Sequence, residues 1–208
     1  QANLNERYVR EWLGAMTCGG IVTCDETGSV FELPPAQAAV LAGKGTTDCL
    51  AHLSQYVSLV GSVEDRLVDC FKEGGGVPYE AFPRFHELMA EDSGQSVVEP
   101  LFTHLLPLVP GITFGLHNGI DVLDVGCGRG KALLKLAEKF PHSRFTGWDL
   151  SAEATSWAQG EATRRGLRNV TFALRDLSTF HEDAPEERFD FVTAFDAIHD
   201  QARPDHVL

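Results

Sequence analysis

The chain has 208 residues, of which 43% are hydrophobic, so it can bury a core, and global disorder is not expected. Its 17 basic and 30 acidic side chains give a net charge of −13, which argues against a nucleic-acid backbone as the main partner and favours a soluble protein. The five cysteines are odd in number and contain no Cys-x-x-Cys pair, so reduced thiols in a cytoplasmic protein are favoured over disulfides or a zinc site. The sequence shows no signal peptide and no long apolar run, so neither secretion nor membrane spanning is predicted.

The first part of the chain predicts a helix followed by a β-hairpin. Residues 4–17 carry apolar side chains at helical spacing, with Asn3 as the expected N-cap. Two short β-like runs, 21–24 and 30–33, are joined by a turn at 25–28. With a further helix after it, this is the layout of a winged helix.

A winged helix often reads DNA, so DNA binding is one alternative for this region. The wing tip carries Asp25 and Glu26, which repel phosphates. Glu6 and Glu11 also lie among the basic residues of the first helix. Packing or dimerisation is therefore the favoured role, and no nucleic-acid partner is expected.

Helices are predicted for the middle of the chain as well. Apolar residues recur at helical spacing in the segments 36–41, 49–59 and 63–72. A glycine-rich stretch at 74–78 then interrupts the pattern.

Three aromatic side chains follow this break. Tyr79, Phe82 and Phe85 are either core aromatics behind a linker or part of a flexible lid that covers a substrate. Residues 97–108 predict another amphipathic helix, closed by prolines.

The pattern changes in the second part of the chain, where strands alternate with helices and predict a parallel α/β sheet. We place the domain boundary between a winged-helix and helical dimerisation or lid region, 1–94, and a sheet domain, 95–208. The expected strands are 120–125, 144–149, 170–174 and 189–195, and the expected helices are 131–139 and a segment from a capping Ser151 to about Arg165.

A glycine loop lies between the first strand and its helix. Gly126, Gly128 and Gly130 allow a tight turn and the close approach of a ligand, and the helix behind them presents unpaired N–H groups. Asp124 stands two residues before the first glycine and suits a ligand with an ammonium group rather than a phosphate. Dinucleotide sites use the different spacing Gly-x-Gly-x-x-Gly. Cys127 has no histidine beside it in sequence and is interpreted as structural.

Carboxylates follow the next two strands, at the edge where ligands bind in such sheets. Asp149, followed by Leu150, is placed to accept hydrogen bonds from the two hydroxyls of a ribose, although a surface aspartate before a helix cap is the alternative. Asp176, followed by Leu177, is either an adenine-binding pair or a capping aspartate with an apolar neighbour.

The fourth strand ends in a polar segment that we expect to face the substrate: Phe195, Asp196, His199 and Asp200. His199 is a candidate general base, with Asp196 as a second catalytic candidate, because histidine titrates near neutrality. The alternative is a histidine hydrogen-bonded to the backbone at the strand end. The histidines have no metal-ligand spacing, so no metal is expected.

Asp-x-Gly-x-Gly-x-Gly resembles motif I of the class I S-adenosylmethionine-dependent methyltransferases. A narrower resemblance, to bacterial winged-helix small-molecule methyltransferases and their eukaryotic relatives, is carried by the segments 6–13, 31–35, 74–79 and 195–200. The resemblance implies a Rossmann-like, doubly wound, mostly parallel sheet behind a winged helix. It also implies a homodimer that uses S-adenosylmethionine, releases S-adenosylhomocysteine and methylates a small molecule.

The same resemblance implies a role for each candidate residue. The methionine end of the cofactor would be held by Asp124 and the loop Gly126, Cys127, Gly128 and Gly130. The nucleoside end would be held by Asp149, Leu150, Asp176 and Leu177, with Phe195 also in contact with the cofactor. The acceptor side would be formed by Tyr79, Phe82, His199 and Asp200.

The full fold of this family has seven strands in the order 3-2-1-4-5-7-6, whereas this sequence stops after the fourth strand. A bare apolar edge strand is an aggregation hazard, so we expect the native protein to continue past Leu208 or a partner chain to supply the missing strands. The first helices of the winged helix are likewise expected before Gln1. Two further alternatives are a winged-helix regulator that senses S-adenosylmethionine without catalysis, and an NAD-linked enzyme, which the glycine spacing opposes.

Overall fold

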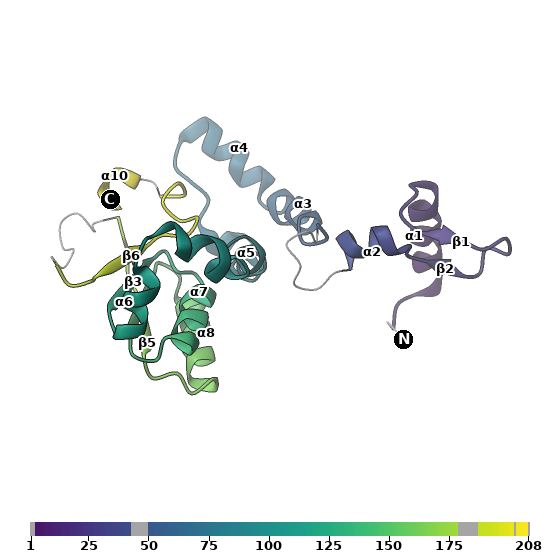
Figure 1. Cartoon of the computed structure of the whole chain (residues 1–208). Helices are drawn as coiled ribbons and strands as arrows, with labels where there is room; N and C mark the ends of the chain where they lie inside the picture. The colour runs from purple at the N-terminus through teal and green to yellow at the C-terminus, as the bar shows by residue number, and fades with distance from the viewer. Residues whose placement is uncertain (1–2, 43–49, 179–186, 202, 208) are drawn as a thin grey trace. The chain divides into compact units, whose positions relative to one another are not determined.

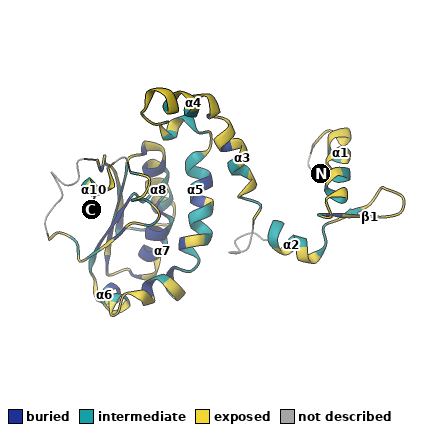
Figure 2. Cartoon of the chain, turned by 90° about the horizontal axis from the view of Figure 1, so that it is seen from above, coloured by how far each residue is buried: buried dark blue, intermediate teal, exposed yellow. Residues whose placement is uncertain are grey.

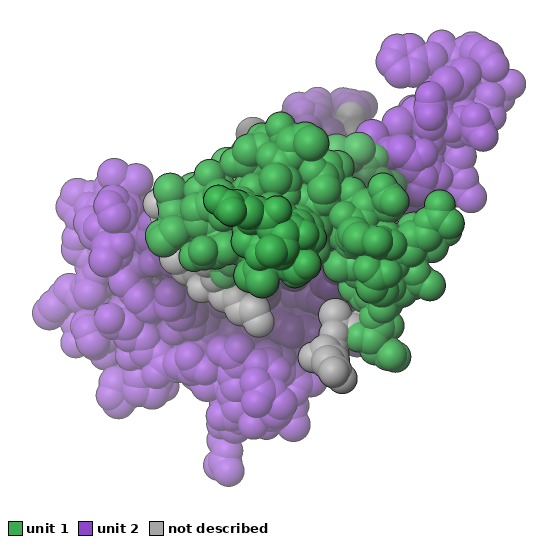
Figure 3. Space-filling model, turned by 90° about the vertical axis from the view of Figure 1, so that its right-hand side faces the viewer, with its two compact units in different colours: residues 1–58 green, residues 59–208 purple. Residues whose placement is uncertain are grey.

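The computed structural model describes residues 3–42, 50–178, 187–201 and 203–207 (Figure 1). Cys49 and Leu208, to which sequence-based expectations refer, lie outside these residues. The chain divides into two compact units, Gln1–Ser58 and Leu59–Leu208, which Figure 3 colours separately. The sequence had predicted the division between residues 94 and 95.

The first unit opens with helix α1, Glu6–Cys18. Its N-cap is Asn5, whose side chain accepts a hydrogen bond from the backbone N–H of Arg7 at 3.1 Å. Asn3, the predicted cap, lies outside the helix with a φ of 49°. The helix therefore begins later than predicted, because an asparagine nearer its first turn satisfies the exposed N–H group.

A short antiparallel hairpin and a helix complete the described part of this unit. Strand β1, Thr23–Cys24, pairs with β2, Phe31–Glu32, and α2, Pro35–Leu41, follows. Asp25 organises the turn between the strands, because its carboxylate accepts hydrogen bonds from the backbone N–H groups of Ser29 and Val30. The predicted helix–hairpin–helix order is confirmed here.

Helices lead into the sheet of the second unit. In chain order they are α3 Ser54–Gly61, α4 Glu64–Glu73, the 3-10 turn η1 Tyr79–Ala81, α5 Phe85–Ser93, the π-helical η2 Gly94–Val98 and η3 Leu101–Leu105, the 3-10 turn η4 Leu106–Leu108, and α6 Ile112–Asn118. Helix α3 begins in the first unit and ends in the second.

The predicted helix 97–108 is the later part of a helical run that starts at α5. Val97 and Leu101 from this run are buried in the same core as the helix behind the glycine loop. This packing joins the later part of the helical run to the core of the sheet unit. Helix α6 was not predicted.

The sheet has four parallel strands in the order β5-β4-β3-β6. These are β3 Asp121–Val125, β4 Arg144–Asp149, β5 Val170–Leu174 and β6 Phe191–Thr193, with α7 Lys131–Lys139 and α8 Ala152–Arg164 between them. The predicted α/β fold is confirmed. Strand β6 is shorter than predicted, and beyond it Asp196 has a φ of 55°, a left-handed conformation that extended strand does not contain.

One face of the sheet is covered by α7 and α8, and the centre of the other face is covered by a smaller core. Alternate strand residues such as Val122 and Phe145 pack against α7 and α8 in the larger core, where Leu133 of α7 is fully buried. Figure 2 shows α7 with a largely buried face. On the opposite face, Trp148 packs with Val207 of a short helix, α10 Pro204–Val207, that the sequence did not predict. The two packed faces leave the carboxyl edge of the strands as the place for a site.

Among the described residues, no single helix has the length and hydropathy of a membrane span; only the pair Phe85–Leu108 and Ile112–Asn118 reaches them jointly, across a bend of 108°.

Candidate active site at the carboxyl edge of the sheet

The glycine loop is tied to the neighbouring strand by backbone hydrogen bonds. The N–H groups of Gly126 and Cys127 both donate to the carbonyl oxygen of Trp148, at 2.8 and 3.1 Å. The N–H of Gly130 then donates to the carbonyl of Cys127 at 2.8 Å and closes the turn into α7. The loop is therefore a fixed element at the strand ends.

Two glycines of the loop serve different purposes. Gly130 has a φ of 62°, and a Cβ at this position would overlap the ring of Phe172. Gly128 has a φ of 53°, but a Cβ there would meet no atom within 4 Å. Gly130 is thus required by packing, whereas Gly128 leaves an open face on which a ligand can approach the backbone.

Asp124 is the buried acid at the start of the loop. Its side chain is only 3% exposed, and its Oδ1 accepts a hydrogen bond from the Thr193 hydroxyl at 2.7 Å. Burial raises the pKa of Asp124 to about 7, the Thr193 hydrogen bond opposes this, and the nearby Asp149 carboxylate adds to it. An ammonium group bound beside Asp124 would favour its ionised form.

Replacing Asp124 with asparagine is expected to change how stability depends on pH. The folded carboxyl titrates at about 7 and the unfolded one near 3.8, so between these values the folded state holds the extra proton. The free energy of unfolding of the wild type therefore falls as pH rises from about 4 to about 7, by at most about 4 kcal/mol from this group. Urea unfolding across this window should show Asp124→Asn gaining stability relative to the wild type, and a constant difference would contradict the assignment.

Asp149 ends β4 and its carboxylate is held by two backbone groups. Its Oδ2 accepts from the N–H of Gly128 at 2.7 Å, and its Oδ1 accepts from the N–H of Ser151 at 2.8 Å. Each oxygen keeps a second lone pair, so the carboxylate can still accept two hydrogen bonds in a fixed orientation. Ser151 caps α8, as predicted, and Leu150 is 55% exposed beside this carboxylate in the chain.

The fold places Asp176 and Leu177 in different environments. Asp176 is exposed, and the backbone N–H of Ser178 donates to its carboxylate at 2.9 Å, which lowers the pKa of Asp176. Leu177 is 3% exposed and packs with Trp148 in the core on the opposite face of the sheet from α7. In this conformation, Leu177 supports the sheet and offers little surface to an adenine ring.

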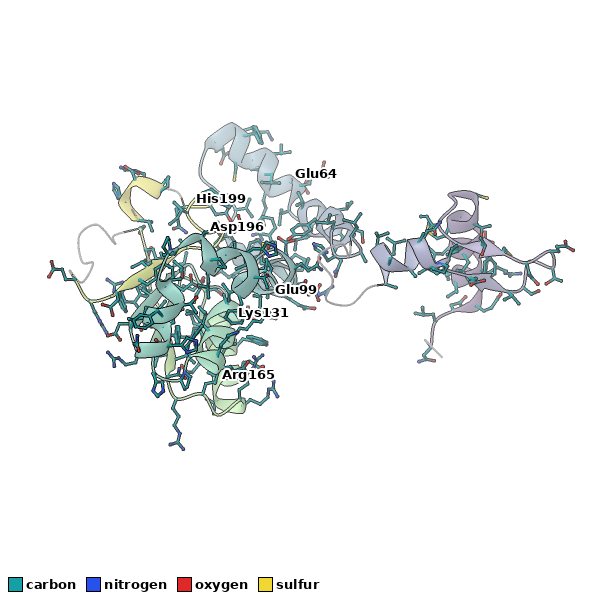
Figure 4. All side chains as sticks on the ribbon, viewed as in Figure 1. Glu64, Glu99, Lys131, Arg165, Asp196 and His199 are labelled. Atoms are coloured by element: carbon teal, nitrogen blue, oxygen red, sulfur yellow. The ribbon has the colours of Figure 1, made fainter. Side chains whose placement is uncertain are left out.

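The segment after β6 brings the predicted acceptor residues together. His199 has its Nε2 at 3.3 Å from Asp200 and its Nδ1 at 3.6 Å from Asp196, and all three side chains are exposed. Figure 4 labels His199 and Asp196, which lie close together. Phe195 instead packs against the core and lines the cavity by the glycine loop. The contacts of His199 with carboxylates can orient its ring for proton transfer.

The aromatic residues after the glycine-rich break form one cluster. Tyr79 stacks on Phe85 with ring centroids 4.7 Å apart, and Phe82 lies 5.8 Å from Phe85. His86 packs edge-on against both Phe85 and Tyr79. The cluster is half-buried and begins the wall that α5 forms beside the glycine loop.

Tyr79 connects this cluster to the strand ends. Burial raises the pKa of Tyr79, and the carboxylates of Asp200 and Asp149 raise it further. The phenol therefore lies within electrostatic reach of both carboxylates, one from each side of the site. Tertiary structure thus brings a residue from before the sheet to its carboxyl edge.

A small cavity of about 60 Å³ lies against the glycine loop. Pockets for nucleoside-sized ligands hold several hundred Å³, so a ligand of that size requires this one to widen. Its walls are α5 with His86, Met89, Ala90 and Ser93, η2 with Val97 and Val98, and the loop region with Asp124, Gly126, Cys127, Arg129, Gly130, Lys131, Ala132 and Phe195. The sequence did not predict that α5 forms a wall of this cavity. The spacing of the aromatic residues before α5 was the only pattern that pointed to it.

The described residues contain no group of three or more His, Cys, Asp or Glu side chains arranged to hold a metal ion. The polar groups at the strand ends are instead backbone N–H groups, the buried carboxyl of Asp124 and the oriented carboxylate of Asp149. This set suits an organic ligand with ammonium and hydroxyl groups.

Two family models match parts of this chain. Residues 116–208 match the family described as "Methyltransferase domain", and residues 1–43 match the "Rv2258c-like winged HTH domain". The chain therefore carries a class I methyltransferase domain preceded by a winged helix–turn–helix domain. The predicted resemblance is confirmed for both regions.

Individual relatives agree with this assignment. Over 83 residues the chain is 37% identical to (S)-coclaurine N-methyltransferase of Papaver somniferum. The matched segment covers 40% of this chain and 23% of that protein. Over 60 residues it is 47% identical to the 2-heptyl-1-hydroxyquinolin-4(1H)-one methyltransferase of Mycobacteroides abscessus, or 29% of this chain and 26% of that protein. The chain thus spans about a quarter of the length of these relatives. The solved structure "PigF with SAH" covers 98% of this chain and 62% of its own, at 17% identity and a TM-score of 0.67, and shows the shared fold.

The residues at the strand ends fit S-adenosylmethionine, the cofactor of these enzymes. Asp124 offers a buried carboxyl for an ammonium group, Gly128 an open backbone face, and Asp149 two unused lone pairs for hydroxyls. The fit rests on these donors and acceptors. The α5 wall of the cavity has to move outward before the whole S-adenosylmethionine molecule can enter.

Proposed function

We propose that this protein is an S-adenosylmethionine-dependent methyltransferase that acts on a small-molecule acceptor. The observation that carries the proposal is the conjunction of a glycine loop, a buried Asp124 and an oriented Asp149 at adjacent strand ends of a methyltransferase domain. S-adenosylmethionine supplies a methyl group activated on a sulfonium, so the protein contributes mainly binding, alignment and exclusion of water.

The cofactor-binding residues divide between two parts of the cofactor. Asp124 and the loop from Gly126 to Gly130, including Cys127 and Gly128, would hold the methionine end. Asp149 would hold the ribose, because its carboxylate is already oriented by Gly128 and Ser151. Leu150, which is exposed, would pack on the adenine, and Asp176 would accept from its amino group. Leu177 would act indirectly, by supporting this strand end from the core.

We assign the acceptor side to two parts of the chain. One is the aromatic cluster that follows the glycine-rich stretch 74–78, and the other is the segment after β6. Tyr79 and Phe82 would contact the acceptor, with Phe195 between acceptor and loop. His199 would take the proton that a hydroxyl or amine loses, since Asp200 at 3.3 Å can orient its ring. Asp196, at 3.6 Å, would assist from the other side.

The small-molecule relatives support the acceptor class. Proteins similar to parts of this chain are named for methylating (S)-coclaurine and a heptyl-hydroxyquinolone. We infer an acceptor of comparable kind, which the aromatic rings of Tyr79 and Phe82 would contact by stacking.

A homodimer and a cytoplasmic location are part of the proposal. Helix α4 presents Phe71 at 93% exposure and Val68 at 46%, apolar surface of the kind that subunit contacts cover. The described cysteines Cys18, Cys24, Cys70 and Cys127 are free thiols, as expected in a reducing compartment.

We expect no nucleic-acid partner. The wing tip is acidic, and hydrogen bonds from Thr27, Val30 and Ser29 lower the pKa of Asp25 to about 2, which keeps it ionised at neutral pH. Salt-dependent retention on DNA would support instead the alternative of a winged-helix regulator that senses the cofactor.

Calorimetry with S-adenosylmethionine, S-adenosylhomocysteine and NAD tests the cofactor. The two sulfur compounds are expected to bind and NAD is not, because the loop lacks the dinucleotide spacing. Binding of NAD alone would overturn the proposal. Turnover of aromatic amines and phenols, followed by release of S-adenosylhomocysteine, then separates an enzyme from a sensor.

A further inference from the structure

Lys131 stands in the first turn of α7, directly after the glycine loop, and lines the cavity (Figure 4). Its Nζ donates to the carbonyl oxygen of Ala90 on α5 at 2.6 Å. The same carbonyl already accepts the N–H of Gly94 at the end of that helix. The Lys131 ammonium therefore connects the loop side of the cavity to its α5 wall. The Ala90 carbonyl oxygen that accepts this hydrogen bond also accepts one from another donor.

Lys135, one turn further along α7, makes a similar contact. Its Nζ donates to the carbonyl of Val98 at 2.6 Å. Lys135 is not among the residues that line the cavity, whereas Lys131 is. The two lysines thus share a structural role between α7 and the α5–η2 segment, and only Lys131 also presents its charge to the cavity.

The charges around the cavity are complementary to a zwitterion. The carboxyl of Asp124 lines it together with the ammonium of Lys131. The other strong cation, Arg129, is paired with Glu153 at 2.5 Å and lies over the ring of Trp157. Lys131 is half-buried, and burial lowers the pKa of its ammonium while the Glu91 carboxylate opposes this. A hydrogen bond between this ammonium and a carboxylate would be charge-assisted and would offset part of the cost of its burial.

The size of the cavity adds a steric condition. About 60 Å³ does not hold a whole nucleoside with its amino-acid end. Ala90, Ser93 and Val97 form the wall that has to move outward. Moving it lengthens the contact between Lys131 and Ala90, which frees the ammonium for another acceptor.

We propose that Lys131 binds the carboxylate of the amino-acid end of S-adenosylmethionine, exchanging its bond to the Ala90 carbonyl for one to the ligand as the α5 wall moves. Asp124 then faces the ammonium of the same ligand. This assignment rests on the proposed function, and it makes Lys131 a determinant of selectivity for ligands that retain the amino-acid end.

The test compares two ligands and two matched variants by calorimetry. S-adenosylmethionine carries the amino-acid end, and 5′-methylthioadenosine lacks it. Lys131→Met is expected to weaken S-adenosylmethionine binding by roughly 10- to 100-fold and to change 5′-methylthioadenosine binding less than about twofold. Lys135→Met loses the same kind of carbonyl contact and should leave both affinities unchanged, and Lys131→Arg should restore most of the loss.

Each outcome has a distinct meaning. Lys131→Met binding S-adenosylmethionine as tightly as the wild type would overturn the assignment and leave the proposed function intact. Equal weakening of both ligands would also overturn it, since this marks a structural role. A wild type that binds neither ligand ends the proposed function and this assignment together.

Discussion

Replacing Asp149 with alanine is expected to weaken S-adenosylmethionine binding by roughly 100-fold, which corresponds to about 2.7 kcal/mol. The carboxylate is fixed by the backbone N–H groups of Gly128 and Ser151 and retains a lone pair on each oxygen for ribose hydroxyls. Hydrogen bonds to a charged group contribute about 1.5–3 kcal/mol each. The loss of two such bonds, at the lower end of this range, accounts for an effect of about this size.

The ligand pair used for Lys131 also serves as the control here. 5′-Methylthioadenosine keeps the ribose, so Asp149→Ala should weaken both ligands by similar factors, in contrast to Lys131→Met. Asp149→Asn keeps one acceptor oxygen and should fall between the alanine variant and the wild type. If calorimetry finds Asp149→Ala with wild-type affinity for both ligands, the ribose role is wrong.

Replacing Gly130 with alanine is expected to lower the free energy of unfolding by roughly 2–6 kcal/mol. A residue with a side chain at a φ of 62° is strained by about 1–3 kcal/mol. The added Cβ would also overlap the ring of Phe172, and overpacking of this kind costs about 1–3 kcal/mol. Urea unfolding followed by the fluorescence of Trp148 and Trp157, which both belong to the sheet unit, measures the change.

Gly128 provides the matched control for this prediction. Its φ of 53° is similar, but a Cβ there meets no atom within 4 Å, so Gly128→Ala should cost only the strain. Shortening the obstructing ring with Phe172→Leu should make the Gly130→Ala change less costly than it is in the wild type. Equal costs at both glycines would contradict the packing role of Gly130.

The sequence by itself determined the central part of the sheet domain. Strands β4 and β5 and helix α7 have the predicted bounds, and Ser151 caps α8 as predicted. In β5 and α7 the apolar side chains follow the period of a strand and of a helix, so local pattern and tertiary packing agree. The glycine loop could be placed for the same reason, since strand, turn and helix are adjacent in sequence.

Local pattern was a poorer guide at the ends of elements. Asn3 and Asn5 are both acceptable caps for α1, and only the geometry of the first turn selects Asn5. Strand β6 stops at Thr193 although its apolar pattern continues, because the backbone turns at Asp196. The two compact units, Gln1–Ser58 and Leu59–Leu208, depend on contacts between residues distant in sequence, such as Lys131 with Ala90, which local pattern does not encode.

Only the tertiary structure decided what surrounds the loop. The contact between Lys131 and Ala90 joins residues 41 positions apart, and the approach of Tyr79 to Asp149 spans an even longer separation. No periodicity encodes such pairs, because they depend on how helices pack over the strand ends. Leu177 shows the same limit, since its place in the sequence suggests a ligand contact while packing with Trp148 turns it into the core. Sequence thus determined the loop and the acids beside it, and long-range packing decided which other side chains reach them.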